Sequence, residues 1–449
     1  MLMASAAGQA PGSSWSKTFG GTETDVVYSV IQTSDGGYAL VGYTTSYGAG
    51  GEDFWLVKTD SSGNMEWSEN FGGTGNERAY SVIQTSDEGY ALAGYTTSYG
   101  AGWRDFWLVK TDSSGNMEWS ENFGGTGSDR AYSVIHTSDE GYALAGYTDS
   151  YGAGGWDFWL VKTDSSGNME WSENFGGTGS DRAYSVIQTS DEGYALAGYT
   201  TSYGAGGEDF WLVKADSSGN EKWSKTFGGE NDDEAYSVIQ TSDGGHALAG
   251  YTDSYGAGGE DFWLVKTDSS GNMEWSENFG GTGSDMACSV IQTSDGGYTL
   301  AGYTGSYGAG MYDFWLVKTD SSGNEVGSRT FGGAGDDYAY SAVQTSDGGY
   351  VIAGSTESYG AGKEDFWLVN VPGPSGGGLI YVAVGAAAVI VVIMAFILYR
   401  RSRGSSSSAF SSMTKNQVGA STRNKYFVFS SGASIPVLES PGPPCTPRL

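Results

Sequence analysis

Acidic side chains recur at a constant interval of 52 residues along this chain of 449 residues, and carboxylates in such numbers could bind calcium or act in acid–base catalysis. The first set follows a repeated Phe-Gly-Gly tripeptide and consists of Asp25, Glu77, Asp129, Asp181, Asp233, Asp285 and Asp337. A second set begins an Asp-Phe-Trp-Leu-Val motif, from Asp53 to Asp365. Calcium takes roughly six to eight oxygen ligands, so the first set is a candidate metal-binding set. The favoured alternative is that these carboxylates accept hydrogen bonds from loop N–H groups.

The same carboxylates could supply the acid and the base of a glycosidase. Such a pair needs two different environments that separate the two pKa values, and seven near-equivalent acids offer little asymmetry. The two histidines, His136 and His246, match no Ser-His-Asp or metal-ligand spacing. We therefore predict no catalytic residues, no enzyme activity and no cofactor apart from calcium at the first set of acids.

Aromatic and charged side chains mark two loops at which the repeats differ from one another. The predicted ligand-binding residues in these loops are Trp103, Arg104, Trp156, Met311, Tyr312 and Tyr338. Exposed aromatic side chains can anchor protein partners, and they can also stack on sugar rings. Neutral drift in tolerant loops produces the same pattern, so both interpretations stay open.

The elements that position these residues repeat with the same period. Phe-Gly-Gly begins at Phe19 and returns without insertion or deletion up to Phe331, and a Thr-Ser-Asp-(Gly/Glu)-Gly turn keeps the same step. A fixed period near fifty residues indicates a solenoid, a propeller or an array.

Each repeat contains four short segments rich in Val, Ile, Tyr and Trp. In one repeat the predicted strands are 80–84, 90–96, 105–111 and 117–123. Short Gly-containing loops between such segments indicate hairpins. Four antiparallel strands with an apolar third strand predict a β-propeller blade. A parallel β-helix has shorter rungs and lacks the paired hairpin turns.

The two ends of the repeat region complement each other. The chain starts with a lone fourth strand, from Trp15 to Phe19, and the repeats end with a third strand, from Asp365 to Asn370. Pairing these two strands would complete a seventh blade and leave no unpaired edge. The predicted fold is therefore all-β, a seven-bladed β-propeller over residues 15–370 whose N-terminal strand closes the last blade.

The repeat also resembles a known family. Its elements Gly-Gly-Tyr, Ser-Tyr-Gly-Ala-Gly, Asp-Phe-Trp-Leu-Val-Lys and Asp-Ser-Ser-Gly-Asn lie between Gly36 and Trp67 in the first repeat. In this order they resemble the repeats of archaeal and bacterial cell-surface β-propeller proteins. The resemblance covers residues 15–370 and implies a propeller exposed at the cell surface, without implying a reaction.

The charge of the chain limits which partners we expect, and its cysteine content limits which disulfide bonds we expect. The chain has 53 Asp and Glu against 22 Lys and Arg, with a formal net charge of −31. Because the repeat region has no basic patch that could release counterions, we exclude nucleic acid as a partner. The two cysteines, Cys288 and Cys445, form no disulfide framework, so we expect no stabilising cross-link and a small buried side chain at Cys288.

A membrane anchor is predicted after the repeats. Residues 371–378 form a Pro/Gly/Ser linker, and the uncharged segment from Leu379 to Tyr399 is long enough for a transmembrane helix. Arg400 and Arg401 follow it directly, which places the basic, Ser-rich and disordered tail, residues 400–449, in the cytoplasm and the propeller outside. Residues 1–14 are interpreted as the remnant of a truncated signal peptide.

Together these features predict a single-pass protein of the cell membrane with an extracellular propeller. We expect it to act as a binding or adhesion module for a glycan or for an envelope or cell-surface protein. The alternatives are an extracellular polymer-degrading enzyme and a calcium-dependent structural protein of the envelope. The sequence predicts no oligomeric state.

Overall fold

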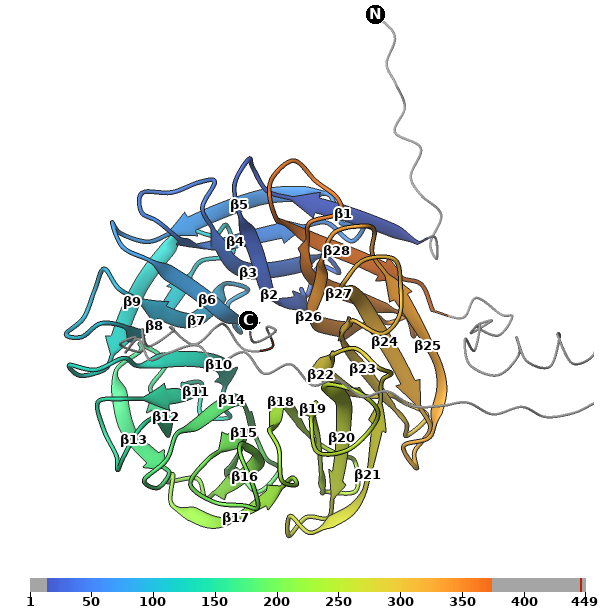
Figure 1. The fold of residues 1–449 in the computed structure, drawn as a ribbon. Helices are drawn as coiled ribbons and strands as arrows, with labels where there is room; N and C mark the ends of the chain where they lie inside the picture. Colours follow the sequence, from blue (N-terminus) through green and yellow to red (C-terminus); the bar gives the residue numbers. More distant parts are fainter. Residues whose placement is uncertain (1–13, 374–444, 446–449) are drawn as a thin grey trace, which may run out of the picture. The chain divides into compact units, whose positions relative to one another are not determined.

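The computed structural model describes residues 14–373 and residue 445. Residues 15–371 form 28 strands in seven four-stranded antiparallel sheets, which surround one axis as the blades of a propeller (Figure 1). The prediction of a seven-bladed all-β propeller is therefore confirmed.

Each blade contains an inner, a second, a third and an outer strand. The inner strands are β2 (Asp25–Gln32), β6 (Glu77–Gln84), β10 (Arg130–His136), β14 (Asp181–Gln188), β18 (Asp233–Gln240), β22 (Asp285–Gln292) and β26 (Asp337–Gln344). The second strands are β3 (Tyr38–Thr44), β7 (Tyr90–Thr96), β11 (Tyr142–Thr148), β15 (Tyr194–Thr200), β19 (His246–Thr252), β23 (Tyr298–Thr304) and β27 (Tyr350–Thr356). The third strands are β4 (Asp53–Thr59), β8 (Asp105–Thr111), β12 (Asp157–Thr163), β16 (Asp209–Ala215), β20 (Asp261–Thr267), β24 (Asp313–Thr319) and β28 (Asp365–Val371). The outer strands are β5 (Met65–Phe71), β9 (Met117–Phe123), β13 (Met169–Phe175), β17 (Glu221–Phe227), β21 (Met273–Phe279), β25 (Glu325–Phe331) and β1 (Trp15–Phe19).

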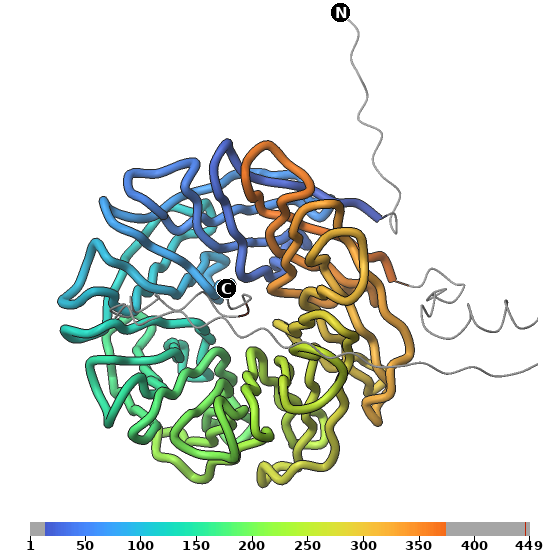
Figure 2. Tube along the Cα trace, viewed as in Figure 1, coloured from blue at the N-terminus to red at the C-terminus, as the bar shows by residue number. Residues whose placement is uncertain are grey.

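The ring closes as predicted. The last sheet has the order β1-β28-β27-β26, and the register of its closing pair runs from Trp15 opposite Asn370 to Phe19 opposite Phe366. The trace shows the first and the last described strands side by side (Figure 2). No edge of the last blade is therefore left without its fourth strand.

The second and third strands form the core because both of their faces are covered by neighbouring blades. All seven residues of β3 and of β4 are buried. Between blades, the third-strand tryptophan packs on the third-strand phenylalanine of the preceding blade, with ring centroids 4.6 Å apart for Phe54 and Trp107. Tilted aromatic pairs at this distance stabilise a contact beyond the area that they bury.

A β-bulge in each inner strand turns one side chain toward the axis. In β6 the pairing with β7 passes from Ala79 to Ser81 and skips Tyr80. The bulge brings the backbone of β6 so close to β7 that a Cβ on Gly94 would lie 1.8 Å from the carbonyl oxygen of Arg78. Because a bulge bends its strand and redirects its extra residue, Tyr80 leaves the blade surface and contacts the equivalent tyrosines of the neighbouring blades.

The bulged residues form a tyrosine ring around the axis. Its members are Tyr28, Tyr80, Tyr132, Tyr184, Tyr236 and Tyr340, with neighbouring centroids 4.8 to 5.2 Å apart. Cys288 takes the seventh position and is buried as predicted.

Buried lysines near the ends of third strands form salt bridges with the hairpin turns between the inner and the second strands. Lys58 contacts Asp35 at 2.7 Å, Glu66 at 2.9 Å and the carbonyl oxygen of Thr59 at 2.9 Å. Its ammonium group thus has three acceptors, which offsets the cost of burying the charge. These pairs hold the third strand to the turn between the inner and the second strand, through Asp35, and to the outer strand, through Glu66.

The predicted membrane span cannot be located in the structure. Within residues 14–373, no helix is long and apolar enough to cross a bilayer. The segment from Leu379 to Tyr399 lies outside the described residues, as do most of the predicted N-terminal remnant, linker and tail.

The bulge yields a stability prediction. Gly94→Ala places a methyl group against the backbone of Arg78, so we expect the free energy of unfolding to fall by about 2 kcal/mol or more. Gly259→Ala is the matched control, since its nearest neighbour is the hydroxyl of Ser284 at 3.0 Å in a surface loop. Denaturant unfolding monitored by tryptophan fluorescence measures both variants, and equal stability would show that the bulge geometry is not required.

Candidate binding sites

The residues predicted to bind a ligand lie at the long-loop end of the ring. We use this name for the end that carries the loops between second and third strands and the connections from blade to blade. Trp103 and Met311 are the most exposed of the predicted set, with exposed fractions of 79% and 70%. These two side chains project from loops and are free to meet a partner.

Three of the other predicted side chains, Trp156, Tyr312 and Tyr338, have partners across blade boundaries. The guanidinium carbon of Arg182 lies 3.8 Å from the centre of the Trp156 ring, so this tryptophan is covered by a cation. Tyr312 and Tyr338 lie 5.3 Å apart between centroids, and both contact Tyr303. The loop residue of one blade therefore pairs with the inner strand of the next blade, which leaves these aromatic faces partly occupied.

At another blade boundary, the loop residue before the third strand and the second residue of the next inner strand form a salt bridge. Arg78 donates to both carboxylate oxygens of Glu52, with distances of 2.5 and 2.6 Å. A bidentate pair of this kind is among the strongest side-chain contacts that a protein forms. It contrasts with the next boundary, where Arg104 and Arg130 hold the two positions and both lie close to the ring of Tyr95.

The acids predicted as metal ligands act as hydrogen-bond acceptors inside the fold. Asp25 is completely buried and accepts from the backbone N–H of Gly21 at 2.8 Å, from the hydroxyl of Ser46 at 2.7 Å and from the hydroxyl of Thr44. The six equivalent acids are buried as well. Residues 14–373 contain no group of three or more Asp, Glu, His or Cys arranged to hold a metal ion. Calcium binding at these acids stays a prediction.

Two sets of carboxylates approach each other at the blade boundaries. A Cβ on Gly176 would lie 1.9 Å from an oxygen of Asp157 and 2.8 Å from an oxygen of Asp181. Burial, followed by the charge of Asp181, raises the pKa of Asp157 to about 6, although the N–H of Ala153 donates to it. The same geometry recurs around the ring, so it singles out no pair as the acid and base of an enzyme.

Shallow pockets between outer strands of neighbouring blades are a feature that the sequence reasoning missed. One has a volume of about 430 Å³ and is lined by Thr226, Phe227, Gly228, Tyr255, Trp263, Met273, Ser276 and Asn278. Another, of about 390 Å³, is lined by Glu69 and by six residues equivalent to those of the first pocket, namely Gly20, Tyr47, Trp55, Met65, Ser68 and Asn70. We call these the outer-wall pockets.

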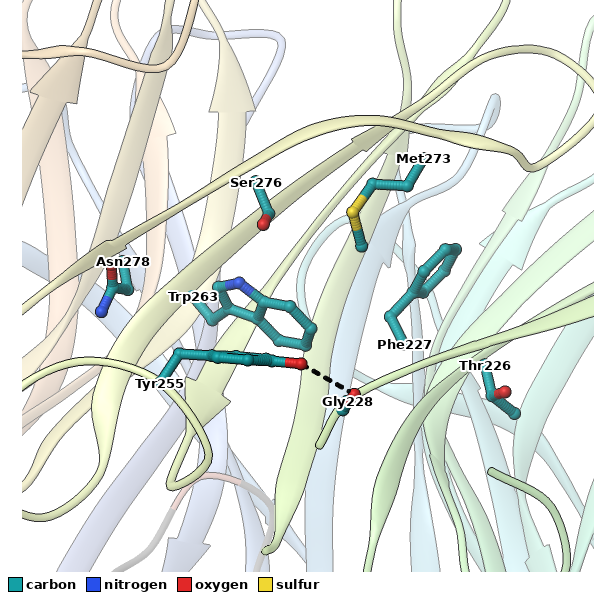
Figure 3. A pocket seen from close by; sticks show the side chains of 8 residues that line it. All are labelled: Thr226, Phe227, Gly228, Tyr255, Trp263, Met273, Ser276 and Asn278. Carbon is teal, nitrogen blue, oxygen red and sulfur yellow. Dashed lines mark hydrogen bonds between the residues drawn. The ribbon is translucent and has the colours of Figure 1, made fainter. Parts of the chain in front are cut away.

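Figure 3 shows how one outer-wall pocket is built. Tyr255 and Trp263 lie next to each other with centroids 5.5 Å apart, and Met273 lies above them on the outer strand. The hydroxyl of Tyr255 donates to the carbonyl oxygen of Gly228 in the preceding blade connection at 2.9 Å, which fixes the ring across the boundary. Ser276 and Asn278 add polar groups from the same strand as Met273. The pocket thus combines an aromatic wall with hydroxyl and amide groups.

One signal for these pockets was present in the sequence. The tyrosine of Ser-Tyr-Gly-Ala-Gly recurs in every long loop and is 39 to 49% exposed throughout. A large aromatic side chain kept at a loop position needs a role other than core packing. The predicted ligand-binding residues lie at positions that differ between the repeats, whereas this tyrosine is the same in all of them.

Comparison with known proteins identifies no family for this chain. No family model matches the sequence, and no curated protein matches it. Among solved structures, the WD40 domain of Neurospora crassa Pan2 is similar with 10% identity and a TM-score of 0.49, covering 79% of this chain and 90% of that domain. Sqt1 from Chaetomium thermophilum has 14% identity and a TM-score of 0.44, covering 76% of this chain and 83% of that one. At these values the comparisons carry no argument about function.

The long-loop end yields a prediction about pH. Burial raises the pKa of Glu364 to about 7, against a value of about 4.3 in an unfolded chain. Between these values the unfolded chain releases a proton that the folded chain keeps, so stability falls as the pH rises from about 4.3 to about 7. We expect Glu364→Gln to stabilise the fold at pH 8 by about 1–3 kcal/mol and to have little effect at pH 4.

Unfolding curves at several pH values check this expectation. The exposed outer-strand variant Glu325→Gln serves as the control, and it should leave the slope of stability against pH unchanged. A Glu364→Gln variant with the slope of the unmodified protein would contradict the buried-carboxylate explanation. Some slope should persist in that variant, because burial also raises the pKa of Glu234 to about 7.

Proposed function

We propose that this propeller is a multivalent glycan-binding module and that the outer-wall pockets are its binding sites. The observation that carries the proposal is the pocket of Tyr255, Trp263 and Met273, which lies beside the polar groups of Ser276 and Asn278. Binding sites for small ligands are concave and largely apolar, with a few polar groups that fix orientation, and their volumes start at roughly 300 Å³. Both outer-wall pockets exceed this volume.

The chemistry of the pocket suits a sugar ring. Tyr255 is 48% exposed and Met273 is 44% exposed, so both present apolar surface that a sugar's C–H face can cover. Ser276 and Asn278 can donate to and accept from sugar hydroxyl groups. A single shallow site of this size would bind weakly, because its polar partners are few and remain hydrated.

Repetition around the ring compensates for weak single sites. Four blades carry the complete combination of Tyr, Trp, Met, Ser and Asn at the pocket positions, and their methionines are Met65, Met117, Met169 and Met273. Because these sites are held on one rigid ring, a polymeric ligand that occupies one meets the next at high effective concentration. Polymeric or clustered glycans would therefore be preferred to free sugars.

Two other blades provide an internal comparison. They carry Glu221 and Glu325 where the four complete blades carry methionine, and Thr226 and Thr330 in place of asparagine. The carboxylate removes apolar surface and adds a hydrated charge at the pocket edge. We infer that these two positions bind the ligand weakly and that the four complete blades hold the active sites.

The cellular location that we propose for this activity is inferred from the sequence alone. An anchor from Leu379 to Tyr399 would hold the ring close to the outside of the membrane, where the partner would be an envelope polysaccharide, a glycoprotein or another cell. The exposed Trp103 and Met311 provide a second surface at the long-loop end, which would suit a protein partner. We propose adhesion through glycans as the role of the whole protein.

The proposal is tested by converting complete pockets to the form that the chain itself carries in two blades. The full-length protein with Met65→Glu, Met117→Glu, Met169→Glu and Met273→Glu should lose binding to an array of envelope and polysaccharide glycans by roughly tenfold or more, because avidity multiplies the loss at each site. Val326→Glu is the control, since it adds a carboxylate to an exposed outer-strand position that lines neither pocket.

Three outcomes would contradict this proposal in different ways. Unchanged glycan binding by the quadruple variant would exclude the outer-wall pockets. Loss of binding in Trp103→Ala alone would move the site to the long-loop end. Shortening of the glycan during incubation would show an enzyme, and the carboxylates at the blade boundaries would then be the residues to replace.

A further inference from the structure

An unusual cluster of arginines lies at the long-loop end, around the axis. We call Arg104, Arg130 and Arg182 the arginine cluster, and they come from the loop before β8, from β10 and from β14. The guanidinium carbons of Arg104 and Arg130 lie 5.3 and 4.9 Å from the centre of the Tyr95 ring. Those of Arg130 and Arg182 lie 6.0 and 5.2 Å from the Tyr147 ring. Arg104 and Arg130 thus lie close to the same tyrosine ring, and so do Arg130 and Arg182.

Two of these arginines lack the carboxylate that a buried cation requires. Within residues 14–373, neither Arg104 nor Arg182 forms a salt bridge, whereas Arg78 at the preceding boundary has the bidentate partner Glu52. The Nε atoms of Arg104 and Arg182 are buried and have no hydrogen-bond partner among the described residues. Arg182 is only 7% exposed. Within residues 14–373, these two buried Nε donors are therefore not satisfied.

The contacts around the cluster do not offset this cost. Arg182 makes cation–π contacts with Tyr147, Trp156 and Tyr199, but a ring face does not replace the hydrogen-bond acceptor that a buried Nε–H donor requires. The charge of Arg182 acts on Glu234, but the two form no salt bridge among the described residues, and both oxygens of Glu234 accept from tyrosines, Tyr236 at 3.1 Å and Tyr251 at 3.0 Å. The buried donors therefore call for a further negative group.

Hydroxyl groups complete the site. The hydroxyls of Tyr80 and Tyr132 are buried in the tyrosine ring and have no hydrogen-bond partner among the described residues. Arg130 lies two residues before Tyr132, the bulged residue of β10. The buried Nε donors of Arg104 and Arg182 and the hydroxyls of Tyr80 and Tyr132 are thus distributed over three consecutive blades.

We propose that the arginine cluster is a binding site for an oxyanion, namely a carboxylate, sulfate or phosphate group. Guanidinium groups match the geometry of such anions and form short charge-assisted hydrogen bonds with them. The anion lies against Arg104 and Arg182, and the tyrosine hydroxyls donate to its remaining oxygens. None of these residues lines an outer-wall pocket, so the site is separate from the proposed glycan sites.

Calorimetric titration of the full-length protein tests this site. The probes are inorganic sulfate, inorganic phosphate and galacturonic acid, each titrated at constant ionic strength against chloride. We expect saturable binding of at least one probe, and a loss in affinity of roughly tenfold or more in Arg104→Gln and in Arg182→Gln, because each removes a charged donor. Arg329→Gln is the control, since this exposed outer-strand arginine carries the same charge far along the chain from the cluster.

The probes separate the two sources of the anion. Sulfate or phosphate binding identifies a free inorganic ion, whereas binding of galacturonic acid alone identifies the carboxylate of an acidic sugar. Arg182→Lys keeps the charge but loses the planar fork, and it should recover only part of the affinity. Absence of binding by all three probes, or equal binding by both glutamine variants and the unmodified protein, would overturn the proposal. Arg104 is only partly buried, so its variant decides the question if Arg182→Gln does not fold.

Discussion

The contact on which the whole structure depends is the pair of a third-strand tryptophan and the third-strand phenylalanine of the preceding blade. It occurs at every boundary with nearly the same distance, 4.6 Å for Phe106 and Trp159 and 4.5 Å for Trp55 and Phe366 at the closing boundary. A ring closes only if every boundary adds the same rotation, so one altered boundary would strain all the others. This requirement explains why the third strand is nearly invariant within the chain, whereas the loops and the other three strands of the blades vary more.

The same geometry decides how the variable positions combine. At the long-loop end, the residue before a third strand meets the second position of the next inner strand, and the two have diverged as pairs. Glu52 has Arg78, Trp156 has Arg182 and Tyr312 has Tyr338. These pairs form without changing the boundary below them. Within residues 14–373, Arg104 and Arg182 form no salt bridge and their buried Nε atoms have no hydrogen-bond acceptor, which is the physical reason to assign them a ligand.

The fold was predictable from the sequence because period, strand length and the complementary ends all pointed to one closed ring. The outer-wall pockets were not recognised, although their tyrosines were visible as a loop residue that never changes. Whether Tyr255 faces solvent or core depends on its hydroxyl reaching Gly228 in another blade, and no local pattern records that contact. The bulge at Tyr80 was not predicted either, because the residues around it have the sequence pattern of a regular strand. The aromatic face of Trp156 was predicted to be available, yet Arg182 covers it, because contacts between blades depend on blade twist.

An anion site in a protein with a net charge of −31 is consistent with the range of electrostatic forces. At physiological salt, exposed charges more than about 8 Å apart are largely screened, so most of the surface carboxylates have little effect at the axis. Buried guanidinium groups are screened much less, and their local field decides which ions are stable beside them. Burial raises the pKa of Glu234, in the blade next to that of Arg182, to about 7, so below that pH the protonated carboxyl does not repel an anion. Local burial, rather than total charge, therefore determines the sign of the ligand that this end of the ring can hold.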